Sequence, residues 1–338
     1  MNTKTKELGQ FYTTNSNYIL SGMEINADNN FIEPFVGNGD LITWLNNKGV
    51  DNVETYDIDP KIECNEIRDT LLNPPDYNDK FIITNPPYLA RNKSTDKTIF
   101  DKWDTNDLYK AFILSFIKGN AKGGIMIIPL NFLCSRDSKI RKEFFRNFKI
   151  DMINIFEEKV FDDTGYTVCS IKFSKITEFP NKTEFKAKLF PSKKYIDINL
   201  SEKYGWLFGG EIFKDVDIDY KIGRLLKGQK QTTNLKLYAI DSGTMDGRIR
   251  LEYDENPFYG SLLDRTCATI STNKKINDEK KISKEFNKRL EEYRKKYHSL
   301  FLNTYRNSTK YYTRKRISFN LSYNLIKQII SETHNEHI

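Results

Sequence analysis

The chain has 338 residues, of which 38% are hydrophobic and 29% are charged, and its formal net charge is +7. This length allows two domains, each with a core of its own. No apolar run approaches the roughly 20 residues of a membrane-spanning helix, and the N-terminal residues lack a signal-peptide-like apolar stretch, so we expect a cytoplasmic protein with no membrane segment.

Cysteine and histidine usage excludes several classes of site. The four cysteines are widely scattered without a CxxC pair, and two of the three histidines lie in the last five residues. We therefore expect buried thiols rather than disulfides, no metal site and no histidine-based catalysis. The excess of Lys and Arg, together with many Tyr and Phe, suits a polyanionic partner.

The first half of the chain alternates strand-like and helix-like segments. Six short apolar runs have the character of buried strands, at residues 31–36, 53–58, 81–84, 124–129, 150–156 and 167–173. Residues 107–118 and 137–147 have helical patterns. Near-continuous apolar strands that alternate with helices predict an α/β domain with a buried, mostly parallel sheet and helices on both faces.

The pattern changes beyond about residue 176, where charged residues become more frequent and the strand–helix alternation fades. We therefore expect a first domain at residues 1–177 and a second at 178–338. In the second, residues 278–302 are predicted to form an amphipathic helix, because apolar or aromatic residues recur there at helical spacing: Ile282, Phe286, Leu290, Tyr293 and Tyr297. Its charged face suits either solvent or a polyanion.

Three polar loops follow strands that should be neighbours in the sheet. The first predicted strand runs into a turn with Gly37 and Gly39, where a backbone can approach a ligand closely. Asp57 ends the second strand, where a carboxylate can accept hydrogen bonds from a ribose diol or cap the next turn. Asp69 follows a third short element. Together these loops predict one crevice at the carboxyl ends of the strands.

The stretch Asn85-Pro86-Pro87-Tyr88 directly follows the apolar run at 81–84. Two consecutive prolines end the strand, because each fixes φ and removes a backbone donor. The resulting stiff loop presents one side-chain amide, backbone carbonyls and an aromatic face. Such a loop suits a planar amino group held by its hydrogens and stacked on a ring, although a Pro-Pro sequence alone is also typical of a plain turn.

These motifs in this order carry a family resemblance. EPFVGNG (33–39), YDIDP (56–60), RDTLL (68–72) and NPPY (85–88), preceded by LGQFYTT (8–14), resemble the S-adenosylmethionine-dependent DNA adenine-N6 methyltransferases with the gamma, TaqI-like motif order found in type II restriction-modification systems. The resemblance covers about residues 8–173. It implies a class I, Rossmann-like methyltransferase fold with a mixed seven-stranded sheet flanked by helices, followed by a smaller, basic α+β target-recognition domain.

The resemblance also implies the residues that hold the cofactor, S-adenosyl-L-methionine. The methionine end would be lined by Gln10, Phe11, Tyr12 and Thr13, and the methionine and ribose flanked by Glu33, Pro34, Gly37 and Gly39. Asp57 would hold the ribose hydroxyls, Ile58 would lie against the adenine ring, and Asp69 would accept from its exocyclic amine. Two departures are visible: Thr14 stands where the family usually has proline, and the stretch from Asp57 to Asp69 is short for a full helix.

By the same resemblance the catalytic set is Asn85, Pro86, Pro87, Tyr88 and Phe161. Asn85 Oδ1 and the Pro86 carbonyl would accept both hydrogens of the amino group and favour the charge that develops on nitrogen. Tyr88 would stack on the base, which must leave the duplex to reach it. Phe161 would form the opposite wall, with Tyr166 as the alternative.

The expected activity is methylation of the adenine N6 amino group in double-stranded DNA, as the modification enzyme of a restriction-modification system. The expected partners are DNA and a cognate restriction endonuclease, with the chain itself a monomer. Alternatives are methylation of RNA adenine, of protein glutamine N5 or of cytosine N4, although the last group more often has Ser at the Asn85 position. Phosphate contacts are expected from Lys274, Lys275, Lys280, Lys281, Arg314, Lys315 and Arg316.

Overall fold

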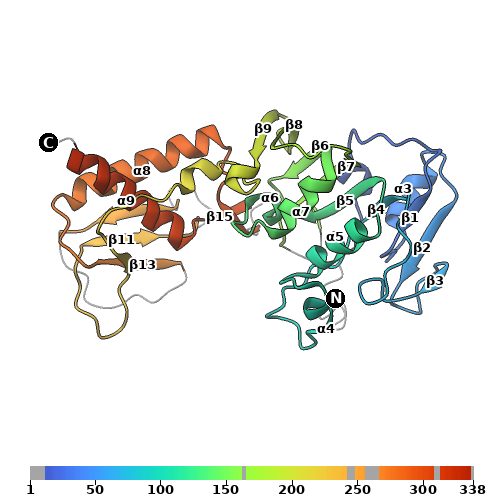
Figure 1. Ribbon diagram of the computed structural model, residues 1–338, viewed down its shortest axis with the longest axis horizontal. Coiled ribbons are helices and arrows are strands. Elements are labelled where there is room, and N and C mark those ends of the chain that lie inside the picture. Colours follow the sequence, from blue (N-terminus) through green and yellow to red (C-terminus); the bar gives the residue numbers. More distant parts are fainter. Residues whose placement is uncertain (1–11, 162–164, 242–247, 256–265, 308–312, 336–338) are drawn as a thin grey trace. The chain divides into compact units, whose positions relative to one another are not determined.

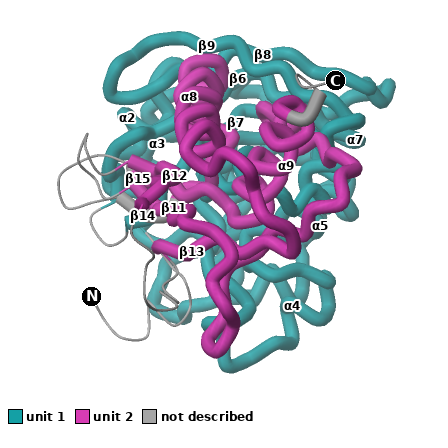
Figure 2. Tube along the Cα trace, turned by 90° about the vertical axis from the view of Figure 1, so that its left-hand side faces the viewer, with its two compact units in different colours: residues 1–206 teal, residues 207–338 magenta. Residues whose placement is uncertain are grey.

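A computed structural model of the chain describes residues 12–161, 165–241, 248–255, 266–307 and 313–335. The chain divides into two compact units, Met1–Trp206 and Leu207–Ile338, which are coloured separately in Figure 2. The division falls about thirty residues beyond the expected boundary at 177.

The first unit is built on one mixed sheet (Figure 1). Within the described residues it has nine strands, in the order β3-β2-β1-β4-β5-β7-β6-β8-β9. The strands are β1 (Phe31–Glu33), β2 (Val53–Asp57), β3 (Glu66–Ile67), β4 (Phe81–Thr84), β5 (Gly123–Pro129), β6 (Phe148–Phe156), β7 (Val168–Lys175), β8 (Lys182–Phe190) and β9 (Tyr195–Ser201).

The first seven strands in this order form the expected class I methyltransferase sheet. Strands β3, β2, β1, β4 and β5 run parallel, whereas β7 is inserted antiparallel between β5 and β6. Side chains of β4 and β5 are buried along their whole length, as a parallel sheet covered on both faces requires. The predicted fold class is therefore confirmed, and the sheet carries two strands more than predicted.

Helices cover both faces of this sheet. They are α2 (Ser16–Ile19), α3 (Asp40–Asn46), α4 (Thr98–Trp103), α5 (Leu108–Lys118), α6 (Asn131–Cys134) and α7 (Lys139–Asn147), followed by the short helix η1 (Glu202–Tyr204). On one face, Phe116 of α5 stacks on Phe173 of β7 with ring centroids 5.3 Å apart. The neighbouring Ser170 points to the other face, where its hydroxyl donates to the Ile19 carbonyl of α2 at 2.6 Å.

Strands β8 and β9 explain why the unit extends to residue 206. Their residues alternate between exposed and buried, so that Phe185 and Ala187 face the core while Lys186 faces solvent. Strand β8 pairs parallel with β6, and β9 pairs antiparallel with β8. The charged residues that suggested a domain change at 177 are thus the outer face of a half-buried sheet extension.

The second unit has an α+β architecture, as expected. Strands β10 (Ile222–Arg224), β11 (Leu235–Tyr238), β12 (Arg250–Tyr253) and β13 (Cys267–Thr272) form one sheet, and β14 (Asn303–Asn307) pairs with β15 (Thr313–Arg316) in a second. The helices are η2 (Gly210–Phe213), α8 (Glu279–Lys296) and α9 (Phe319–Asn335).

Helix α8 is the amphipathic helix expected at 278–302. The Asp278 side chain caps it by accepting from the Lys281 N–H at 2.8 Å, and Ile282, Phe286 and Leu290 are buried. The helix ends at Lys296, because His298 and Ser299 adopt positive φ.

The two units differ in charge. Residues 207–338 contain 25 Lys and Arg against 17 Asp and Glu, a net charge of +8, whereas residues 1–206 contain 28 against 29, a net charge of −1. The excess positive charge of the protein therefore belongs to the second unit alone. No helix in the described ranges is long and apolar enough to span a membrane.

Candidate active site

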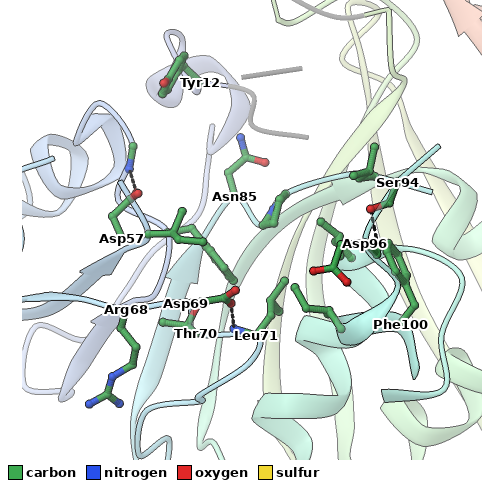
Figure 3. Close-up of a pocket in the computed structure, with 17 residues that line it drawn as sticks. Tyr12, Asp57, Arg68, Asp69, Thr70, Leu71, Asn85, Ser94, Asp96 and Phe100 are labelled. Atoms are coloured by element: carbon green, nitrogen blue, oxygen red, sulfur yellow. Dashed lines mark hydrogen bonds between the residues drawn. The ribbon is translucent and has the colours of Figure 1, made fainter. Parts of the chain in front are cut away.

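A cavity of about 270 Å³ opens at the carboxyl ends of β1, β2 and β4 (Figure 3). Asp57 and Asp69 lie on one side of it, Asp96 and Phe100 lie on the other, and Asn85 lies between them. The crevice predicted from three separate loops is therefore one cavity.

The glycine turn after β1 is tied to the end of β2. The Gly37 N–H donates to Asp57 Oδ2 at 2.9 Å, and the Asp59 N–H donates to Asp57 Oδ1 at 2.8 Å. Each carboxylate oxygen keeps a further lone pair for a ligand hydroxyl. Gly37 has φ +54°, and a Cβ there would lie 3.2 Å from Tyr12 Cδ1, so this position needs glycine on both conformational and steric grounds. Asp57 thus caps the turn and lines the cavity at once.

Glu33 is a buried carboxyl close to this turn. Its Oε1 accepts from the Phe35 N–H at 2.9 Å and from the Thr84 hydroxyl at 2.6 Å, and only 1% of the residue is exposed. Among the described residues, its Oε2 has no hydrogen-bond partner. Burial raises the pKa of Glu33 to about 8, although the two hydrogen bonds lower it. An orphaned buried oxygen of this kind suits a cationic or hydrogen-bond-donating ligand group.

The other end of the cavity is suited to a flat ring. Asp69 Oδ1 accepts from the N–H groups of Leu71 and Leu72, both at 3.0 Å, which fixes the carboxylate at the cavity wall. Ile58 is 44% exposed and presents apolar surface. Leu89, Ile99, Phe100 and Leu108 add further apolar surface to the lining of the cavity. Sequence reasoning missed these four residues, whose only signal was an apolar character shortly after the NPPY stretch.

The NPPY loop lies where β4 ends. The Asn85 Nδ2 donates to the Thr13 hydroxyl at 3.0 Å, so the amide is oriented by the N-terminal segment. The Tyr88 hydroxyl lies against both Asn85 Oδ1 and the Ile127 carbonyl oxygen, the latter 2.6 Å away. One hydroxyl proton serves only one acceptor at a time. Burial raises the pKa of Tyr88 well above its usual value, so the hydroxyl stays protonated.

The aromatic residues around this loop are arranged differently from the expectation. The Tyr88 ring is only 2% exposed and meets Tyr166 edge-on, with centroids 6.0 Å apart. Tyr166 lines a second cavity of about 590 Å³ beside residues 90–92 that follow the loop. Phe161 is 1% exposed and lines neither cavity. Gln10 and Phe11 lie outside the described residues.

Asp107, which precedes α5, is a half-buried acidic residue that sequence reasoning missed. It lines the second cavity, and its Oδ1 has no hydrogen-bond partner within the described residues. Burial raises the pKa of Asp107 to about 6, against the attraction of Lys110 and of backbone N–H groups. In the sequence it appeared only as the start of a predicted helix.

The cysteines and acidic residues form no metal site in the described ranges. None of the four cysteines, which all lie in the described ranges, forms a disulfide. Three are buried, as expected, and Cys64 is half-buried.

Comparison with known proteins agrees with this geometry. Residues 12–161 match the model of the Eco57I restriction-modification methylase family. This segment is similar to restriction-modification methylases. Over 194 residues, 51% of the chain, the sequence is 29% identical to the type II methyltransferases M.HincII of Haemophilus influenzae and M.HindII of Haemophilus influenzae strain ATCC 51907 / DSM 11121 / KW20 / Rd.

The match is partial on both sides. It covers 38% of M.HincII and 37% of M.HindII, so the chain spans less than half the length of the curated relatives it matches. Among solved structures, the type I restriction-modification methyltransferase subunit from Streptococcus thermophilus is 15% identical, with a TM-score of 0.41, and the match covers 53% of this chain and 48% of that one. The fold of the first unit is assigned from its own strand order.

The cavity of the first unit fits S-adenosylmethionine. Asp57 has lone pairs left for a ribose diol, and Asp69 holds an acceptor beside the apolar wall where an adenine ring would lie. Glu33 does not line this cavity, and its orphaned Oε2 is buried close to the glycine turn. Asp57 and Asp69 thus supply acceptors that suit the ribose and the adenine of the cofactor.

Proposed function

We propose that the chain is a site-specific DNA methyltransferase that uses S-adenosylmethionine to methylate the N6 amino group of adenine in double-stranded DNA. The observation that carries the proposal is the Asn85 amide. It lies at the wall of the cofactor cavity, where its nitrogen donates to the Thr13 hydroxyl and its oxygen lies against the Tyr88 hydroxyl. An amide oxygen has two lone pairs, and we propose that one of them accepts from the amino group of the base.

We further propose how the cavity holds the cofactor. Asp57 binds the ribose hydroxyls, Asp69 and Ile58 bind the adenine, and Glu33 with the turn at Pro34, Gly37 and Gly39 flanks the ribose and methionine. Tyr12 and Thr13 contact the methionine end, where the family resemblance also implies Gln10 and Phe11, which lie outside the described residues. S-adenosylmethionine supplies an electrophilic methyl group bound to a sulfonium.

The chemistry of the loop is hydrogen-bond acceptance. An adenine amino group is a weak nucleophile because its lone pair is delocalised into the ring. Asn85 Oδ1 and the Pro86 carbonyl accept its two hydrogens and favour a tetrahedral nitrogen with its lone pair directed at the methyl. As positive charge develops on nitrogen, these fixed dipoles bind the transition state better than the ground state. The methylated ammonium then loses its proton to water, so no general base is needed.

We propose that Tyr88 and a second aromatic residue sandwich the extruded base, with Pro87 holding Tyr88 in the loop. Because the Tyr88 ring is only 2% exposed without DNA, it has to move to present a face to the base. Phe161 was the first candidate for the opposite wall. Tyr166 is the better supported of the two, since it lines the neighbouring cavity and touches the Tyr88 ring.

The second unit, with a net charge of +8, is proposed to bind the DNA. As the modification enzyme of a restriction-modification system, the chain would act as a monomer beside a cognate restriction endonuclease that reads the same site.

The test is transfer of tritiated methyl groups from S-adenosylmethionine to unmethylated genomic DNA, tRNA and a protein extract, followed by nucleoside and amino-acid analysis. We expect label in DNA, as N6-methyladenine. Label in N4-methylcytosine would overturn the proposal that adenine is the methylated base. Label in RNA or in glutamine would overturn the proposal that DNA is the substrate.

A further inference from the structure

The second unit contains a pocket of about 470 Å³ lined by two cations and two aromatic rings. Arg224 ends β10, Arg316 ends β15, and Phe319 and Tyr323 lie in the first turns of α9. Three separate elements thus place two guanidinium groups and two rings around one hollow, and no carboxylate lines it.

Local structure explains why these side chains converge. Lys315 and Ile317 are 4% and 0% exposed, so the alternation along β15 turns Arg316 to the opposite, accessible side. Phe319 and Tyr323 are four residues apart and share one face of α9, with ring centroids 6.1 Å apart and planes at 33°. The Arg224 Cζ lies 5.8 Å from the Phe319 ring centroid, within cation–π range.

Four other arginines of this unit have an acidic partner, whereas the described residues give Arg224 and Arg316 none. Arg248, Arg250, Arg289 and Arg294 each pair with a carboxylate. In the part of the chain that the structure describes, no carboxylate forms an ion pair with Arg224 or Arg316. Two uncompensated guanidinium groups in one pocket attract an anion with several acceptor oxygens, and phosphate is the group that guanidinium donors match best.

We propose that this pocket binds a backbone phosphate of the DNA duplex, with the guanidinium groups of Arg224 and Arg316 on its oxygens. The Phe319 and Tyr323 rings orient Arg224 and pack against the adjoining deoxyribose. This proposal rests on the proposed function, because it takes DNA as the substrate, and it names a place where the second unit contacts the DNA backbone. A phosphate contact positions the duplex without reading its sequence. Lys315, by contrast, is too buried for the phosphate contact expected from the sequence.

Because the contact is independent of sequence, it can be tested with any labelled duplex. Affinity is measured by fluorescence anisotropy at a series of salt concentrations for the full chain and for Arg224→Ala/Arg316→Ala. Each lost phosphate contact lowers the slope of log K against log salt by about 0.9. We expect the double variant to lower it by about 1 to 2 and to weaken binding about tenfold or more at moderate salt.

Arg248→Ala is the matched control. It removes one positive charge from the same unit, but that charge is already paired with Glu291 at 2.6 Å. We expect its salt slope to equal that of the unmodified chain. Arg224→Lys/Arg316→Lys keeps both charges, so it should restore the slope with part of the affinity. Thermal unfolding of each variant separates loss of contact from loss of fold.

Three outcomes would overturn the proposal. If the unmodified chain binds and methylates DNA but the double alanine variant has the same salt slope, the pocket does not bind a phosphate, and the proposed function still stands. A loss of tRNA binding without loss of duplex binding assigns the pocket to RNA. If the unmodified chain binds no duplex, both the phosphate-binding role of the pocket and the proposed DNA substrate are wrong.

Discussion

At the scale of single residues, the account depends on the side-chain oxygen of Asn85. Asn85→Ala removes this acceptor from a loop that two prolines keep in place, so the cavity beside it should keep its shape. We expect methyl transfer to fall by a factor of about 10² to 10³ or more, as for the loss of one fixed dipole at a developing charge. Binding of S-adenosylmethionine, measured by calorimetry, should stay within a few-fold. Full activity in this variant would sink the mechanism.

Two substitutions of Tyr88 distinguish a stacking role of its ring from a hydrogen-bonding role of its hydroxyl. Tyr88→Phe keeps a ring and loses the hydroxyl that lies against the Ile127 carbonyl and Asn85 Oδ1, which should cost about 1 kcal/mol of folding stability. Tyr88→Ala loses the ring, and with it the stacking surface for the base. We therefore expect a much larger fall in transfer rate for the alanine variant. Equal damage in the two variants would implicate the hydroxyl instead.

Glu33 gives a pH dependence whose sign can be worked out. Its folded pKa of about 8 lies above the ordinary carboxyl value of 4.5, so the folded protein holds a proton that the unfolded chain has lost. Its contribution to stability is complete at low pH and is lost as pH rises from about 4.5 to 8, at about 1.4 kcal/mol per pH unit. Urea unfolding of Glu33→Gln should lack this slope. A parallel decline in both proteins would show that Glu33 is already ionised.

Binding of the cofactor should remove the proton from the Glu33 carboxyl. If the methionine ammonium lies against Oε2, it favours the ionised carboxyl, and binding at pH 7 releases about one proton. Calorimetry in buffers of different ionisation enthalpy measures that proton directly. Glu33→Gln should release none.

At the scale of elements, the sequence predicted six of the nine described strands of the large sheet, β1, β2, β4, β5, β6 and β7, and the loops that follow them, since buried strands read as continuous apolar runs. It missed β8 and β9, because a half-buried strand alternates apolar with polar residues. It also missed the apolar lining from residues 89–108 and the carboxyl of Asp107. Those side chains meet the site only through tertiary packing, which no local pattern encodes.

The sheet extension makes a prediction of its own. Phe185 and Lys186 are neighbours on β8, with Phe185 6% exposed and Lys186 facing solvent. Phe185→Ala should destabilise the first unit by about 3–5 kcal/mol, and Lys186→Ala by less than about 0.5 kcal/mol. Denaturant unfolding measures both. Equal effects would mean that β8 is not packed as part of the unit.

At the scale of the whole molecule, chemistry and charge are divided between two units. The near-neutral first unit holds the cofactor cavity and the NPPY loop, and the second carries the net positive charge of +8. We infer that one unit modifies the base and the other provides the electrostatic attraction for the polyanion. The order of the motifs predicted this division, whereas the residues of the second unit that contact DNA could be proposed only once β10, β15 and α9 were seen together.

The most direct test of the central claim is nucleoside analysis by mass spectrometry of DNA from a host without adenine methylation of its own. The host expresses either the unmodified chain or Asn85→Ala. The account predicts N6-methyladenine in DNA from cells with the unmodified chain and none above background with the variant. No N6-methyladenine with the unmodified chain, or equal amounts with both, would contradict it.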